Sequence, residues 1–167
     1  GSRLQIKGLS LGDRESSGTG SLTIRNGATV TVGNSALSRI MTVHSPTDDA
    51  SQLRVHGVNS KFDAPDVKLL VGGTEAEGLP ANVSLEAGGE ASTGGVSIGF
   101  GGGTASVEVT DARWVIEESK PPGLLNIGNA GKGVLQIHER GVVSVRGSDD
   151  KTFPRVELGR TEGSRLE

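Results

Sequence analysis

The chain carries three histidines, His44, His56 and His138. Histidine is the side chain most often used for proton transfer or metal binding near neutral pH. His56 and His138 each follow directly after a pair of apolar residues, so they occupy equivalent positions in a repeated pattern. Because two repeat units lie between them, we do not expect them to share a metal ion, and we expect no cofactor.

Other short motifs also have the composition of chemical sites. Asp48-Asp49 and Asp149-Asp150 could supply calcium ligands, but the aspartate-rich nonapeptide calcium repeat is missing, so we interpret both as solvated loops. Gly-x-Ser-x-Gly occurs at 8–12 and 95–99. A catalytic serine in that motif needs a strand-to-helix turn, and we expect no helix after either copy. Residues 101–103 are three glycines without the lysine of a phosphate loop, which favours a tight turn.

These residues belong to a repeated step of the form apolar-x-apolar-Gly. A second apolar pair follows each step, then a turn rich in Gly, Asn or Asp, then a looser third segment that is weak at 90–92. The glycine position returns every 27 to 32 residues, and His44 takes it once. The steps lie at residues 9–12, 41–44, 69–72, 96–99, 125–128 and 156–159.

The apolar spacing within each segment is two, which is typical of strands, and no stretch has helical periodicity. Three short strands per unit of about 30 residues predict an all-β, right-handed parallel β-helix of about five to six coils. A β-sandwich would explain the alternation but not the return of the same positions. In the predicted register Ile127 stacks between Ile98 and Leu158, while Asn126 faces outward, so Asn126→Asp should cost little.

The same register predicts which side chains share the outer surface. Neither of two outward columns places two carboxylates on adjacent coils, so we expect no acid–base pair and no enzyme. Phe62 and Trp114 share one position, which indicates packing and not a ligand platform. The columns are Ser10, Thr42, Leu70, Ser97, Asn126 and Glu157 for the first strand, and Thr23, Arg54, Ser84, Glu108 and Gln136 for the second.

Composition limits the remaining classes of protein. Of 167 residues, 27 are glycine, 2% are aromatic and none is cysteine, which excludes a disulfide scaffold. The net charge of −3 does not favour nucleic acid as a partner. No apolar run is long enough to span a membrane as a helix.

Residues 125–143 and 18–30 resemble the repeats of bacterial autotransporter passenger domains, although His44 and Ala91 depart from that pattern. The resemblance implies a β-helix on the bacterial cell surface or secreted from it, acting as adhesin or stalk. Implied partners are a host cell-surface or matrix protein or glycan, or a second copy, with membrane attachment only through a C-terminal barrel outside this chain. A fragment of a carbohydrate-active β-helix lyase or hydrolase is the alternative.

We further expect residues 1–167 to form a single segment of a larger passenger, with residues 1–2 and 166–167 as cloning remnants. The connections from each third strand to the next first strand differ in length and sequence, and we expect them to form one ridge, termed here the interaction ridge. Its candidate residues are Asp63, Asp66, Lys68, Glu117, Glu118, Lys120, Arg146, Asp149, Asp150, Lys151 and Phe153.

Overall fold

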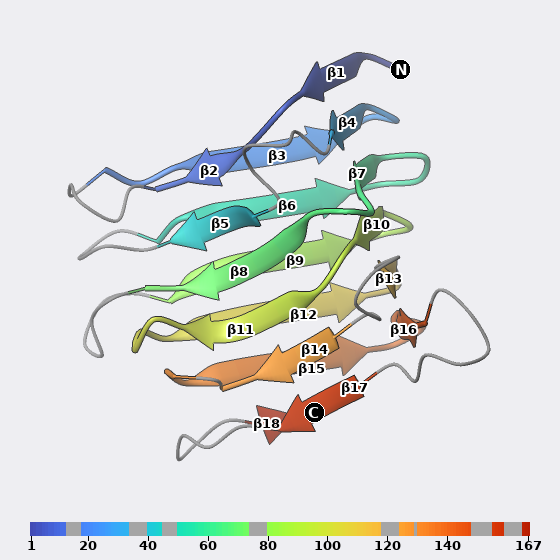
Figure 1. Ribbon diagram of the computed structural model, residues 1–167. Helices are drawn as coiled ribbons and strands as arrows, with labels where there is room; N and C mark the ends of the chain where they lie inside the picture. Colours follow the sequence, from blue (N-terminus) through green and yellow to red (C-terminus); the bar gives the residue numbers. More distant parts are fainter. Residues whose placement is uncertain are drawn as a thin grey trace.

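The chain folds as a right-handed coil of short parallel strands (Figure 1). The computed structural model describes residues 1–12, 18–33, 40–44, 50–73, 80–117, 124–128, 130–147, 155–158 and 165–167. Within these ranges every regular element is a β-strand, and strands follow one another around three sheets in strict rotation. This arrangement confirms the predicted all-β parallel solenoid with three strands per coil.

Each of the three sheets has six strands, and adjacent strands pair in parallel. Sheet A contains β1 (Arg3–Ile6), β4 (Thr29–Val32), β7 (Lys61–Ala64), β10 (Glu90–Thr93), β13 (Arg113–Glu117) and β16 (Val142–Arg146). Sheet B contains β2 (Ser10–Leu11), β5 (Ile40–His44), β8 (Lys68–Gly72), β11 (Val96–Phe100), β14 (Leu124–Ile127) and β17 (Arg155–Leu158). Sheet C contains β3 (Ser21–Arg25), β6 (Gln52–His56), β9 (Ala81–Glu86), β12 (Ala105–Thr110), β15 (Gly133–His138) and β18 (Arg165–Leu166).

The backbone pairing confirms the register derived from the repeat. Ile127 pairs with Ile98 on one side and with Leu158 on the other, and Ile127 is fully buried. The weak third segment at 90–92 is a full strand, β10. The repeat alone did not identify β1 or β18. Directly after β18, the Glu167 N–H donates to the Leu135 carbonyl oxygen of the neighbouring strand β15.

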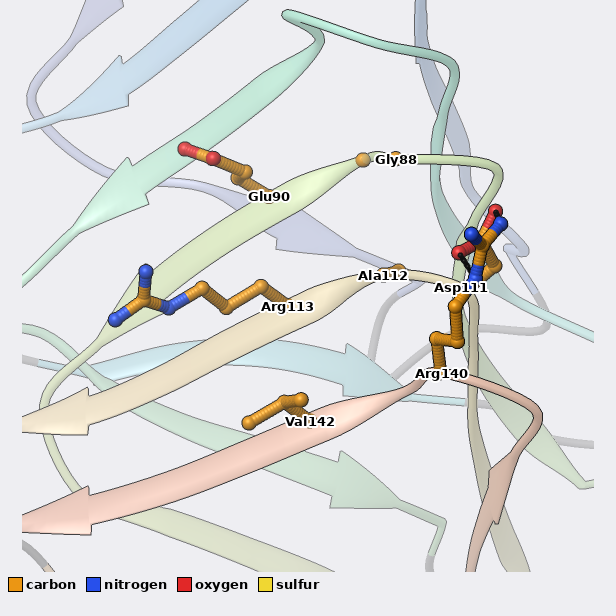
Figure 2. Close-up of a pocket in the computed structure, with 8 residues that line it drawn as sticks. Gly88, Glu90, Asp111, Ala112, Arg113, Arg140 and Val142 are labelled. Atoms are coloured by element: carbon orange, nitrogen blue, oxygen red, sulfur yellow. Dashed lines mark hydrogen bonds and ion pairs between the residues drawn. The ribbon is translucent and has the colours of Figure 1, made fainter.

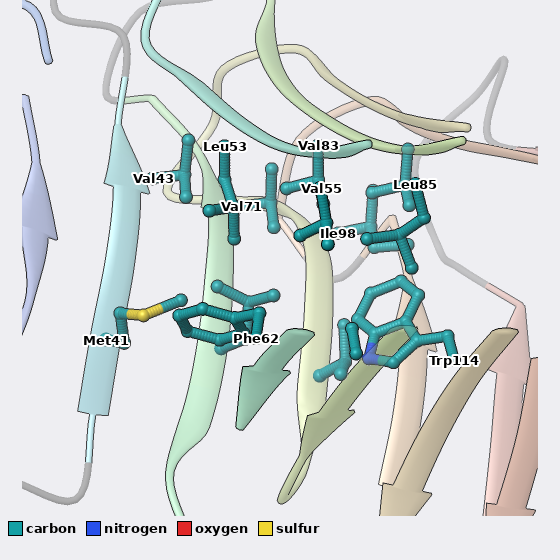
Figure 3. Packing of buried hydrophobic residues seen from close by; sticks show 14 of the residues in the cluster. Met41, Val43, Leu53, Val55, Phe62, Val71, Val83, Leu85, Ile98 and Trp114 are labelled. Atoms are coloured by element: carbon teal, nitrogen blue, oxygen red, sulfur yellow. The ribbon is translucent and has the colours of Figure 1, made fainter. Parts of the chain in front are cut away.

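The core is a narrow column of apolar side chains, most of them aliphatic, and the aromatic Phe62 and Trp114 are its largest members (Figure 3). Both rings are fully buried, which confirms that they are packing residues. Ala91 pairs with Phe62 on the preceding coil and with Trp114 on the following coil, so the small side chain lies between the two largest ones. The indole Nε1 of Trp114 donates to the hydroxyl of Thr93 at 3.0 Å, so its polar atom is satisfied inside the core.

The corner between sheets C and A is tight in every coil. Each coil places one non-glycine residue there at positive φ, a backbone conformation that costs an ordinary side chain energy. These residues are Asn26, Asn59, Ala87, Asp111 and Glu139. At the corner after sheet B, Gly12 has a φ of 79°, whereas Gly72 and His44, at the equivalent positions, end their strands without a positive φ.

Candidate functional site

The described residues of the interaction ridge lie where sheet A passes to sheet B. Asp63 is in β7, Lys68 begins β8, and Asp66 lies in the turn between them. Glu117 and Arg146 end β13 and β16 and stand opposite each other in register. The other candidates, namely Glu118, Lys120, Asp149, Asp150, Lys151 and Phe153, lie outside the described residues.

The topology brings all these connections to one corner, because each joins a strand of sheet A to the next strand of sheet B.

A second corner, from sheet B to sheet C, also carries connections of unequal length. Its connection is short after β11, which ends at Phe100, and longer after β8, which ends at Gly72. Sequence reasoning missed this second edge, although the spacing from the glycine position to the second apolar pair already varies from coil to coil.

The outer face of sheet C holds a charged cluster centred on Glu86. One Glu86 carboxylate oxygen lies 2.6 Å from Nη2 of Arg54 and 3.4 Å from Nδ1 of His56. The other oxygen accepts a hydrogen bond from the Ser84 hydroxyl. We call Arg54, His56, Ser84 and Glu86 the Glu86 cluster; its members come from the adjacent strands β6 and β9.

The surroundings of Glu86 determine its charge. Burial raises its pKa, but hydrogen bonds from Ser84 and Arg54, the charge of Arg54 and the hydrogen bond from His56 together outweigh burial. The pKa of Glu86 is therefore held below its ordinary value of 4.5. Such a carboxylate stays ionised at neutral pH and is poorly suited to donate a proton.

A shallow groove of about 280 Å³ runs across this face, and both Glu86 and Glu108 line it. Glu108 pairs with Ser84, so the two carboxylates are diagonal neighbours on adjacent strands. The register of the second-strand column was predicted correctly, but comparison within one column could not detect a diagonal pair. The sequence did contain the information needed to predict this diagonal pair, because Glu86 lies two residues after Ser84 and therefore on the same face of the strand.

A second groove, of about 220 Å³, lies at the corner between sheets C and A (Figure 2). At its side Arg140 binds Asp111 through two contacts, Nε to Oδ1 at 2.9 Å and Nη2 to Oδ2 at 3.1 Å. Glu90 and Arg113 are adjacent in register and project from sheet A apart from that pair, as Figure 2 shows. The groove is thus an open surface that carries two pairs of opposite charges beside the exposed side chain of Val142.

The remaining motifs have structural positions. Ser10 and Ser97 lie within β2 and β11, and the next regular element after each is a strand, as expected. Ser97 is only 2% exposed and Leu70 only 7%. The middle of the outer face of sheet B is therefore closed to solvent, although the sequence placed both side chains in a column on the outer surface. Residues 101–103 form the predicted tight turn between β11 and β12.

The described residues contain no group of three or more His, Cys, Asp or Glu side chains that could hold a metal ion. His56 and His138 share a column, but Glu86 and Thr110 separate them, as the repeat predicted. Asp48-Asp49 and Asp149-Asp150 lie outside the described ranges. The described part of the chain also holds no helix with the length and apolar character needed to cross a bilayer.

The fold and its faces define a parallel β-solenoid with an apolar core and with ion pairs on its outer surface. Comparison with protein-family models, with curated proteins and with solved structures found no match to this chain. The surfaces of the coil are therefore the basis on which a function can be argued.

Proposed function

We propose that this chain is a non-enzymatic, surface-exposed β-helical segment of the autotransporter passenger type. It mediates or supports attachment to a host cell-surface or matrix protein or glycan, or association with a copy of itself. One observation carries the proposal: the strands repeat from coil to coil, whereas the connections from sheet A to sheet B differ and all leave from one corner.

Packing explains why that difference points to recognition. A residue in a core position of the strands contacts its equivalents on both neighbouring coils, so a change there affects three coils. A connection on the corner is not held by that stacking and tolerates changes in sequence, which is why binding residues concentrate on loops. Asp63, Asp66, Lys68, Glu117 and Arg146 give the described part of the ridge both signs of charge. A surface of this kind suits a protein partner of mixed charge.

The experiment uses the chain displayed on a bacterial surface, with attachment to host cells and to matrix-coated plates as readouts. In one variant a short Gly/Ser linker replaces residues 147–153. A second carries Asp63→Asn, Glu117→Gln and Arg146→Gln together. The matched control carries Thr23→Ala, Glu108→Gln and His138→Gln, which alter the outer face of sheet C and leave the ridge intact.

Weaker attachment or weaker cell–cell aggregation by both ridge variants, with normal binding by the control and unchanged melting temperatures, would support the ridge as the binding surface. Unchanged attachment by both ridge variants would refute that location and leave the segment as a stalk. A matching loss in the control would indicate a general charge effect.

A second candidate function is a carbohydrate-active β-helix enzyme, and the groove shared by Glu86 and Glu108 is the observation in its favour. Paired carboxylates catalyse glycoside hydrolysis when one of them can donate a proton. The ion pair with Arg54 argues against that role for Glu86. Incubation with acidic polysaccharides, with and without calcium, should release no new reducing ends or unsaturated products. Turnover that disappears in Glu86→Gln or Glu108→Gln would reverse the ranking of the two functions.

A further inference from the structure

The turn from β3 to β4 contains the sequence Asn26-Gly27. Both residues have positive φ, 58° and 70°, and the N–H of Ala28 donates to the carbonyl oxygen of Arg25 at 3.1 Å. These features describe a tight two-residue turn, for which Asn-Gly is the preferred sequence. The Asn26 side chain is exposed to solvent.

A side chain from the next coil engages this turn. The N–H of Gly27 donates to the hydroxyl oxygen of Ser60 at 3.1 Å, and Ser60 is fully buried. The N–H of Ser60 donates in turn to the Gly57 carbonyl oxygen at 3.1 Å, which fixes the position of the serine. The amide nitrogen that follows Asn26 is therefore occupied by the second coil whenever the first two coils are in contact.

An asparagine followed by glycine has an intrinsic covalent reaction. The glycine nitrogen loses its proton and attacks Cγ of the asparagine side chain; an N–Cγ bond forms, the Cγ–Nδ2 bond breaks, and ammonia leaves. Water then opens the resulting cyclic imide at either carbonyl carbon and leaves an aspartate or an isoaspartate. Glycine favours the first step because it has no Cβ to obstruct the attack.

We propose that Asn26 is a self-modification site, and that the hydroxyl of Ser60 on the neighbouring coil controls its rate. While Ser60 accepts the Gly27 proton, the nitrogen cannot present itself to Cγ of Asn26. The reaction proceeds when the hydrogen bond from the Gly27 N–H to Ser60 opens. The product carries a new negative charge at the corner, and the isoaspartate form also lengthens the main chain by one methylene within a turn that spans only two residues.

The test compares two serine variants with the parent chain. Ser60→Ala removes the acceptor at the modification site. Ser51→Ala is the matched control, because the fully buried Ser51 also joins the first two coils by accepting from a glycine, Gly20, at 3.1 Å. Each protein is incubated at mildly alkaline pH, and modified Asn26 is quantified by peptide mass mapping and by enzymatic methylation of isoaspartate.

We expect Ser60→Ala to react about fivefold faster than the parent, a factor that converts to about 1 kcal/mol, the net worth of one hydrogen bond. Ser51→Ala should react less than twofold faster, because it leaves the Gly27 contact in place. Equal acceleration by both variants would overturn the role of Ser60 and assign control to coil separation alone. An unchanged rate in Ser60→Ala would overturn it as well.

A second measurement does not depend on either variant. The parent chain is incubated folded and, separately, unfolded in urea, and the rates at Asn26 are compared. Slower reaction in the folded chain, by about tenfold or more, is expected if the coil contact protects the site with about 1.4 kcal/mol or more. Equal rates in the two states would refute protection by the fold.

Discussion

Replacing Ile127 tests the stacked core directly. Ile127 is fully buried, and its register partners on the neighbouring coils are Ile98 and Leu158. Ile127→Ala removes three carbon atoms from this column, and substitutions of this type cost about 2 to 5 kcal/mol. We expect about 3 kcal/mol, which corresponds to a fall in melting temperature of about 6 to 12 °C for a chain of this size. Ile127→Asp should cost more, because it buries a charge without a partner.

The neighbouring position gives a contrasting result. Asn126 points to the outer face, and its Nδ2 donates to Glu157 Oε2 at 3.1 Å. Sequence alone treats Asn126→Asp as nearly neutral, but this contact changes the expectation, since the variant would place two carboxylates on adjacent strands. We expect a cost of about 1 kcal/mol at neutral pH, and the cost should shrink as falling pH protonates one of the two groups.

The three variants are measured by urea unfolding followed by circular dichroism, with Thr23→Ala as an exposed control expected to change stability by less than about 0.5 kcal/mol. Curves for two probes must coincide before a single free energy is quoted, because repeat arrays can unfold in stages. Equal shifts for Ile127→Ala and the Thr23→Ala control would show that Ile127 does not stack between coils, and the register would be refuted.

Three further changes test other parts of the structure. Ala87→Gly should stabilise the chain by about 0.5 to 1 kcal/mol in urea unfolding, since Ala87 has a φ of 52° and relief of strain of about 1 to 2 kcal/mol exceeds the added freedom of the unfolded chain. Glu86→Gln should reduce the free energy of unfolding at neutral pH. Because folding lowers the pKa of Glu86, the stabilisation by its ionised carboxylate is lost as the pH falls through the folded pKa, so plots of stability against pH for the parent and the variant should converge in acid. Thr93→Val leaves the buried Trp114 N–H without an acceptor and should cost about 1 to 3 kcal/mol, with a change in tryptophan fluorescence; unchanged fluorescence and stability would contradict that contact.

Much of the fold could be predicted because stacking makes each coil repeat the same inward positions. The pairs Val43 with Val71 and Val71 with Ile98 are aliphatic at every step, so their spacing reveals the coil length and the register together. The glycine position was less regular than the repeat suggested. A bulge displaces the pairing so that Gly72 lies opposite Phe100, where a Cβ on Gly72 would come within 2.2 Å of the Phe100 carbonyl oxygen.

Three features could not be predicted from the apolar repeat, each for a different physical reason. Glu86 becomes a charged centre only because Arg54 and Ser84 reach it from diagonal and same-strand positions. Ala91 departs from the resemblance as a single residue, and its size becomes intelligible only when Phe62 and Trp114 are seen on either side of it. Nothing in the sequence indicated the positive φ of Ala87, because alanine has no preference for that backbone conformation.

The outer faces impose a rule opposite to that of the core. In a parallel stack, identical outward residues would stand directly opposite one another about 4.8 Å apart, so a repeated charge would repel itself along the whole coil. The described columns avoid this arrangement: Lys61 is followed by Glu90 and then by Arg113, and Glu117 faces Arg146. Alternation of charge at outward strand positions therefore follows from electrostatics whether or not anything binds there.

This distinction affects how the interaction ridge must be judged. Glu117 faces Arg146, so alternation of charge between strands accounts for its identity, and Asp63 lies 3.5 Å from Nζ of Lys61 on its own strand. Asp66 instead lies in the turn between β7 and β8. If the ridge binds a partner, neutralising Asp66 together with replacement of residues 147–153 should weaken attachment while leaving the melting temperature within about 2 °C, because neither change touches the stacked core. A fall in melting temperature that accompanies the lost attachment would instead show that the corner supports the coil, and the evidence for recognition at that edge would be lost.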